Sequence, residues 1–131
     1  MAKIKVVYND HYSIDIDQQK NRAYLALQGF WKDKSAVGNF LDDIRLALEK
    51  LQDNFTLIVD LTHYDGISSG MHHIHVEAQK LAGQKHLNKI AEIFSENQMV
   101  KMFSEMYSKE SGINTMAFKS VEHAERWLDL Y

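Results

Sequence analysis

Two adjacent serines at the start of a predicted helix form the segment of this sequence best suited to chemistry. Ser68 and Ser69 stand between Gly66 and Gly70, shortly after an apolar run that ends at Leu61. Open α/β sheets place their sites in loops at the carboxyl ends of strands. The free amides and the dipole at a helix start would stabilise an anion there, including a phosphate on Ser68. The spacing alone favours a structural interpretation over this one, in which a serine caps the helix and the glycines permit the turn.

Histidines surround the same segment. His63 precedes the serines, and His72, His73 and His75 follow them. His72 and His75 share part of a helical face and, with His63 or Asp65, have the ligand types of a metal site. The zinc-helix pattern of two histidines four apart with a glutamate between them is absent, so we expect no tight metal site and no cofactor. Histidines titrate near neutral pH, which predicts a pH response.

No catalytic motif stands out in the sequence. The run Gly66-Ile67-Ser68-Ser69-Gly70 is one residue too long for the G-x-S-x-G nucleophile elbow. The phosphate-binding patterns G-x-x-x-x-G-K-S/T and G-x-G-x-x-G are also missing. These absences favour a non-enzymatic protein, with a small enzyme that uses the histidines of the segment from His63 to His75 as a further alternative.

A second candidate surface is rich in methionine. Met99, Met102 and Met106 recur at steps of three and four, and with Val100, Phe103 and Tyr107 they form a wide apolar stripe. Methionine-rich surfaces adapt to protein partners or to loose apolar ligands. The alternative is a deeply buried helix, for example at a dimer contact.

Strands and helices alternate along most of the chain. We predict strands over residues 3–8, 12–17, 23–30, 55–61, 87–94 and 113–118, and helices from Asp33 or Ser35 to about Gln52, from Met71 to Leu81, over 98–109 and from Ser120 onward. Residues 63–70 are predicted as a loop, and the last helix should turn Val121, Ala124, Trp127 and Leu128 inward. The order predicts an α/β fold: a mixed sheet with an N-terminal hairpin and about four helices.

Length, charge and composition narrow the class of protein. A chain of 131 residues suits one domain over residues 1–131, and there is neither cysteine nor proline. The net charge of −3, with basic and acidic residues mixed, argues against a nucleic-acid partner. No apolar stretch is long enough to span a bilayer, so we expect a cytoplasmic protein without membrane insertion.

The segment Leu57-Ile-Val-Asp-Leu-Thr-His-Tyr-Asp-Gly-Ile-Ser-Ser-Gly-Met71 resembles the signature of the STAS domain, the fold of anti-sigma-factor antagonists. Asp60-Leu61 and Ser68-Ser69-Gly70 match it most closely. Upstream, YLALQG over residues 24–29 resembles the family's strand ending in Leu-x-Gly. The closing FKSVEHAERWL over 118–128 resembles the strand-then-helix end of the SpoIIAA-like branch.

The resemblance implies a bacterial regulatory module that binds a protein: a kinase, an anti-sigma-type regulator or a second copy of itself. It places the phosphoacceptor at Ser68, in an interaction loop that comprises Tyr64, Asp65, Gly66, Ile67, Ser68, Ser69 and Gly70. Ile67 stands where the family carries an acidic residue. Because the SpoIIAA-like branch resembles lipid carriers in architecture, a carrier or sensor of a small apolar ligand is the second expectation.

Overall fold

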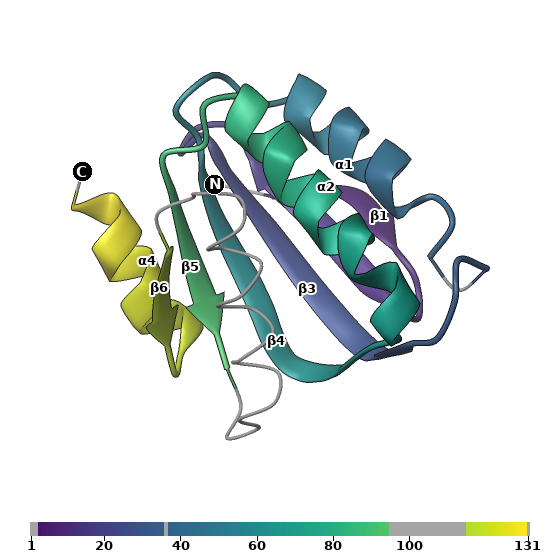
Figure 1. The fold of residues 1–131 in the computed structure, drawn as a ribbon. Coiled ribbons are helices and arrows are strands. Elements are labelled where there is room, and N and C mark those ends of the chain that lie inside the picture. The colour runs from purple at the N-terminus through teal and green to yellow at the C-terminus, as the bar shows by residue number, and fades with distance from the viewer. Residues whose placement is uncertain (1–2, 36, 95–114, 131) are drawn as a thin grey trace.

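Six strands form one mixed sheet in the computed structural model, which describes residues 3–35, 37–94 and 115–130. The strands are β1 (Ile4–Tyr8), β2 (Tyr12–Asp17), β3 (Arg22–Trp31), β4 (Thr56–Ile67), β5 (Lys89–Ile93) and β6 (Thr115–Phe118), and they lie side by side in chain order. Strand β2 pairs antiparallel with both β1 and β3, and β3 to β6 run parallel. The predicted mixed α/β sheet with its N-terminal hairpin is confirmed (Figure 1).

Three helices of the described residues cover the two faces of this sheet. Helices α1 (Phe40–Glu49) and α2 (His72–Gln84) lie together over one face, and α4 (Val121–Asp129) packs on β4, β5 and β6 (Figure 1). None of these helices is long and apolar enough to cross a membrane. The helix predicted over residues 98–109, which carries Met99, Met102 and Met106, lies outside the described residues.

The period-2 pattern of the strands divides the core between the two faces. In β4 and β5, Val59 and Ile90 belong to the large core beneath α1 and α2, whereas Ile58, Ala91 and Ile93 pack against α4. Strand β2 buries its Tyr12, Ile14 and Ile16 face beneath α1, as its alternation predicts.

Helix α1 begins later than predicted. The expected start at Asp33 or Ser35 is wrong, because Asp33 accepts hydrogen bonds from the backbone N–H and the hydroxyl of Ser35 instead. Such local side-chain bonds hold a turn and compete with helix formation. The helix begins only at Phe40, which is buried against the core.

The last helix agrees with prediction at its start and differs in its inward face. The Ser120 side chain caps α4 by accepting a hydrogen bond from the His123 N–H. Ala124 and Leu128 are buried, but Val121 is exposed and Trp127 is only half-buried, packed beside Phe118. A short helix on the outer part of a sheet buries one narrow stripe, and Val121 lies beyond it.

Candidate functional site

The segment predicted as the interaction loop is largely strand. Tyr64 to Ile67 belong to β4, because β3 continues to Trp31 and pairs with them as far as Ile67. The prediction of a loop over 63–70 is therefore wrong for residues 63–67. Two irregularities in this pairing place Gly29 and Gly66 at positive φ, +68° and +115°, which residues with a side chain rarely adopt.

Ser68 is the first residue after β4. Its backbone N–H donates to the Trp31 carbonyl over 3.0 Å, and its carbonyl accepts from the Met71 N–H over 3.0 Å. A short 3-10 turn, Ser69–Met71, then leads directly into α2. The prediction that Ser68 and Ser69 stand at a helix start is confirmed, although the Ser68 side chain makes no capping hydrogen bond.

The Ser68 hydroxyl bonds across to another segment. It donates a hydrogen bond to the backbone carbonyl of Lys32, just after β3. Around it, Asp65, Ser69 and Gly70 are exposed and Ser68 itself is partly exposed, whereas Tyr64, Gly66 and Ile67 are buried. We use the name Ser68 surface for Asp65, Ser68, Ser69, Gly70 and the adjoining Lys32. Of the predicted interaction loop, only Asp65, Ser68, Ser69 and Gly70 face solvent.

The histidines do not converge on one site. His63 and His73 are exposed and His72 is partly exposed, whereas His75 is buried on the inward face of α2. Among the described ranges, no group of three or more histidine, aspartate or glutamate side chains is placed to hold a metal ion. The possible ligands noted in the sequence, His72 and His75 with His63 or Asp65, are therefore not brought together within the described residues.

His75 lies in an aromatic cluster. Its Nε2 shares a hydrogen bond of 2.7 Å with the Tyr64 hydroxyl, and its ring stacks on Trp31 at 5.0 Å between centroids. Phe40 packs edge-on against both rings. Burial, and to a lesser degree the nearby His72, lowers the pKa of His75 to about 3. The expectation that this segment's histidines respond near neutral pH is thus wrong for His75, which stays uncharged.

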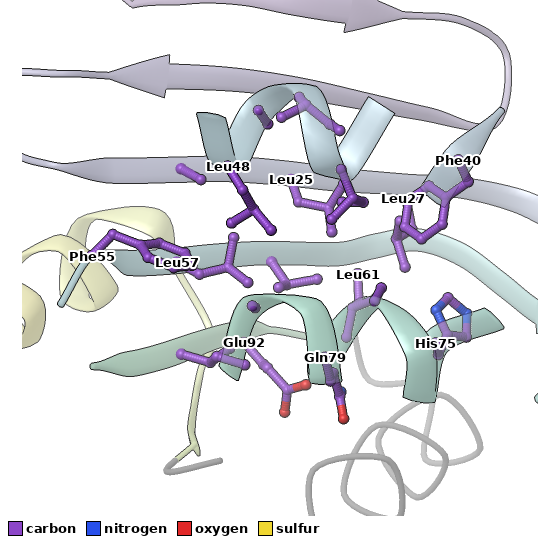
Figure 2. Close-up of a pocket in the computed structure, with 18 of the residues that line it drawn as sticks. Leu25, Leu27, Phe40, Leu48, Phe55, Leu57, Leu61, His75, Gln79 and Glu92 are labelled. Carbon is purple, nitrogen blue, oxygen red and sulfur yellow. The ribbon is translucent and has the colours of Figure 1, made fainter. Parts of the chain in front are cut away.

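A cavity of about 90 Å³ lies between the sheet and the two helices α1 and α2. Figure 2 shows its labelled apolar walls, which include Leu25, Leu48, Leu57 and Leu61. The polar side chains among its lining residues are Tyr64, His75, Gln79 and Glu92. A space of this size is several times what one water molecule requires, so it can hold a compact apolar molecule.

Two solved structures share this architecture. An uncharacterized protein of the DUF3478 family from Shewanella loihica, described as having a SpoIIAA-like fold, superposes with a TM-score of 0.65 at 14% identity. The fold is SpoIIAA-like. An anti-sigma factor antagonist from Mycobacterium paratuberculosis superposes with a TM-score of 0.58 at 10% identity. Each likeness covers 93% of this chain and 97% of the other protein.

The likeness extends to the fold and no further. No protein-family model matches the sequence, and no curated protein matches it either. The SpoIIAA-like fold that Asp60-Leu61 and Ser68-Ser69-Gly70 indicate is confirmed by both structures. The role of Ser68 stays a prediction.

Sequence reasoning missed the polar groups that line the cavity. Met71, His75, Ala78 and Ala82 follow one another at steps of three and four, which places His75 on the inward face of α2. That spacing was the available signal for a buried histidine. Gln79 follows His75 by four residues and reaches the same cavity.

Proposed function

We propose that this chain is a non-enzymatic regulatory module that binds another protein through the Ser68 surface. The observation that carries the proposal is the position of Ser68, partly exposed at the carboxyl end of the central strand β4 and directly before α2. The SpoIIAA-like fold supports it, because one protein of that fold is an anti-sigma factor antagonist. The partner is accordingly a kinase or an anti-sigma-type regulator, with a second copy of the chain as the alternative.

Phosphorylation of Ser68 would change both charge and shape at this surface. A phosphate adds about −1.5 to −2 charges and replaces a hydroxyl donor with acceptor oxygens. The hydrogen bond from Ser68 to the Lys32 carbonyl would then be lost, and the two acceptors would repel each other. The turn that carries Lys32 and Asp33 would have to move away from β4.

The first test compares Ser68→Asp with Ser69→Asp, which adds the same charge at the neighbouring exposed residue. Pull-downs from the native host, followed by a binding titration of each captured partner, give the readout. We expect Ser68→Asp to weaken the complex at least tenfold and Ser69→Asp to weaken it less. Ser68→Ala should keep the partner and lower the free energy of unfolding by about 0.5–1.5 kcal/mol, the contribution of one hydrogen bond.

Identical partners and affinities for the wild type, Ser68→Asp and a bulky Ser68→Trp would exclude the Ser68 surface. The methionine stripe of Met99, Met102 and Met106 would then be the better candidate for the interaction.

The cavity favours a second function, that of a carrier or sensor for a small apolar ligand. Its walls are mostly leucine, isoleucine, alanine, valine and phenylalanine side chains, which suit such a ligand. A native mass spectrum of the protein purified from its host should reveal a small bound molecule. Protein without added mass that also fails to bind small aromatic compounds in solution would exclude this function.

A further inference from the structure

We propose that the chain pairs with a second copy of itself around Phe30, with Lys32 of each copy opposite Asp65 of the other. The proposal rests on the proposed function, because it takes up the second copy named there as the alternative partner and shares Lys32 and Asp65 with the Ser68 surface. It adds Phe30 as the apolar centre of the contact.

Strands β3 and β4 extend together past the pairing of their neighbours. The register of β2 with β3 ends at Leu27, and that of β5 with β4 ends at Asp60. From there to Trp31 and Ile67, β3 and β4 pair as strands only with each other among the described residues. A two-stranded end of this kind can be approached by a second molecule.

Phe30 lies on the outer face of this two-stranded end. The next residue, Trp31, is fully buried and packs against Phe40 of α1 and His75 of α2. Successive side chains of a strand point to opposite faces, so Phe30 is turned away from both helices, and it is 50% exposed. Its ring lies over Gly66 of β4, where a Cβ would be 3.9 Å from two of the ring carbons.

The backbone around Phe30 is distorted on both strands. Gly29, immediately before it, and Gly66, its partner on β4, have positive φ, and the register shifts between Gly29 and Phe30. Irregularities of this kind re-aim side chains and are frequent next to functional sites. An aromatic side chain that such a distortion presents to solvent favours a role in contact with another molecule.

The charged residues beside Phe30 make this surface complementary to itself. Asp65 precedes Gly66, the β4 partner of Phe30, whereas Lys32 follows Phe30 by two residues. The two residues therefore lie on either side of Phe30 along the strand direction, and both are exposed. Among the described residues, neither takes part in an ion pair.

A two-fold axis uses this arrangement directly. A half turn about an axis that passes beside Phe30 and runs across the strands brings the two Phe30 rings together. The same rotation places each Lys32 opposite Asp65 of the other copy, so the contact contains two equal ion pairs. Two-fold symmetry of this kind is the commonest among protein oligomers.

The contact is small, so the association is weak. One ring from each copy and two exposed ion pairs bury less than the roughly 1,200 Å² of a stable interface. We expect a dissociation constant of about 0.05–0.5 mM, with weaker association in high salt because the ion pairs are screened.

Sedimentation equilibrium of the untagged protein from about 20 µM to about 1 mM covers this range. Phe30→Ser removes the apolar centre of the contact. Lys32→Asp places acidic residues opposite each other, and Asp65→Lys does the same with basic residues. Leu46→Ser and Lys50→Asp are matched controls at exposed positions in α1 and directly after it.

We expect Phe30→Ser to weaken association at least tenfold and each charge reversal to weaken it at least fivefold, whereas the controls change it less than twofold. An equimolar mixture of Lys32→Asp and Asp65→Lys should associate with nearly the wild-type constant, because the mixed pair has two attractive contacts. That rescue requires the two residues to meet across two molecules, so a purely structural effect of either substitution cannot produce it.

A wild type that stays monomeric at about 1 mM would overturn the proposal. A kinase or an anti-sigma-type regulator would then remain as the partner of the Ser68 surface, which the pull-downs with Ser68→Asp test separately. A mixture that associates no more tightly than its two components alone would also overturn the proposal, as would full association of folded Phe30→Ser. If Phe30→Ser does not fold, the mixture decides.

Discussion

At the scale of single residues, the buried imidazole of His75 ties stability to pH. In the unfolded chain this group takes up a proton near pH 6.5, whereas in the folded protein its pKa is about 3. Between these two values the unfolded state binds more protons. The stability contributed by the neutral ring is therefore present above about pH 6.5 and is lost progressively as the pH falls toward 3.

The variant His75→Phe removes this titration and keeps an aromatic ring against Trp31. As the pH falls from 6.5 to 4, we expect the free energy of unfolding to decrease more steeply for the wild type than for the variant. The difference between the two slopes should reach up to about 1.4 kcal/mol per pH unit. Urea denaturation at several pH values measures the difference. The same substitution at the exposed His73 should leave the wild-type slope nearly unchanged. Parallel slopes for the wild type and His75→Phe would show that His75 is protonated in the folded protein.

Single residues also show where sequence patterns mislead. Asp43 sits on the charged face of α1 and reads as a solvated carboxylate, yet it accepts a hydrogen bond of 2.5 Å from the Tyr12 hydroxyl. This hydrogen bond joins residues 31 positions apart, so no local sequence pattern indicates it. The Tyr64–His75 contact is of the same kind, because its two partners come from β4 and α2.

At the scale of elements, the buried Arg22 of β3 helps to hold α4 against the sheet. The Arg22 side chain is 4% exposed and forms ion pairs with Glu125 and Asp129 of α4. The Tyr24 hydroxyl donates to both carboxylate oxygens of Glu125 at 3.1 Å. Burial, followed by the charge of Glu125, raises the pKa of Tyr24 to about 12.

We expect Glu125→Gln to lower the free energy of unfolding by about 1–3 kcal/mol, because it weakens the pairing of a buried charge while Asp129 stays in place. Glu122→Gln on the same helix removes an exposed pair with Arg126 and should cost less than about 0.5 kcal/mol. Chemical denaturation of the two variants is the measurement. Equal, small losses would mean that α4 is held by its apolar stripe alone.

The sequence predicted the elements whose signal is periodic. The alternation in β2, the dense apolar run of β4 and the stripe of Ala124 and Leu128 all appear where expected. The prediction from sequence failed where the conformation of a segment depends on a partner that is distant in the sequence. Tyr64 to Ile67 read as a loop because of Gly66, and they are strand because β3 extends alongside them. Local propensity cannot report the length of a neighbouring strand.

The candidate site was predicted in part for the same reason. The family resemblance led to Ser68, and the structure places Ser68 at a strand end before a helix, as expected. The cavity was not predictable, since its lining comes from four strands and two helices. The apolar residues on these elements are those that any buried core requires, so they do not indicate a cavity. Gln79 becomes noticeable only when its Oε1 is found without a partner in the described part of the chain.

At the scale of the whole molecule, the chain has neither proline nor cysteine. Proline isomerisation, which takes tens to hundreds of seconds, therefore cannot delay refolding. We expect the amplitude of every refolding phase to be independent of how long the protein has been held unfolded. A double-jump experiment with unfolding delays from one second to ten minutes measures this. A slow phase that grows with the delay would contradict the expectation.

The parallel pairing of β3 with β4 has a consequence for synthesis on the ribosome. Strands β1, β2 and β3 leave the exit tunnel first and can pair as local antiparallel neighbours, but α1 must be made before β4 appears. At ordinary translation rates this takes a few seconds. Throughout that interval the β3 edge that later receives β4 has no partner strand, and such an edge can recruit another chain. Nascent chains of this protein thus present an open β3 edge, and with it a route to aggregation, between the completion of Trp31 and the arrival of Ile67.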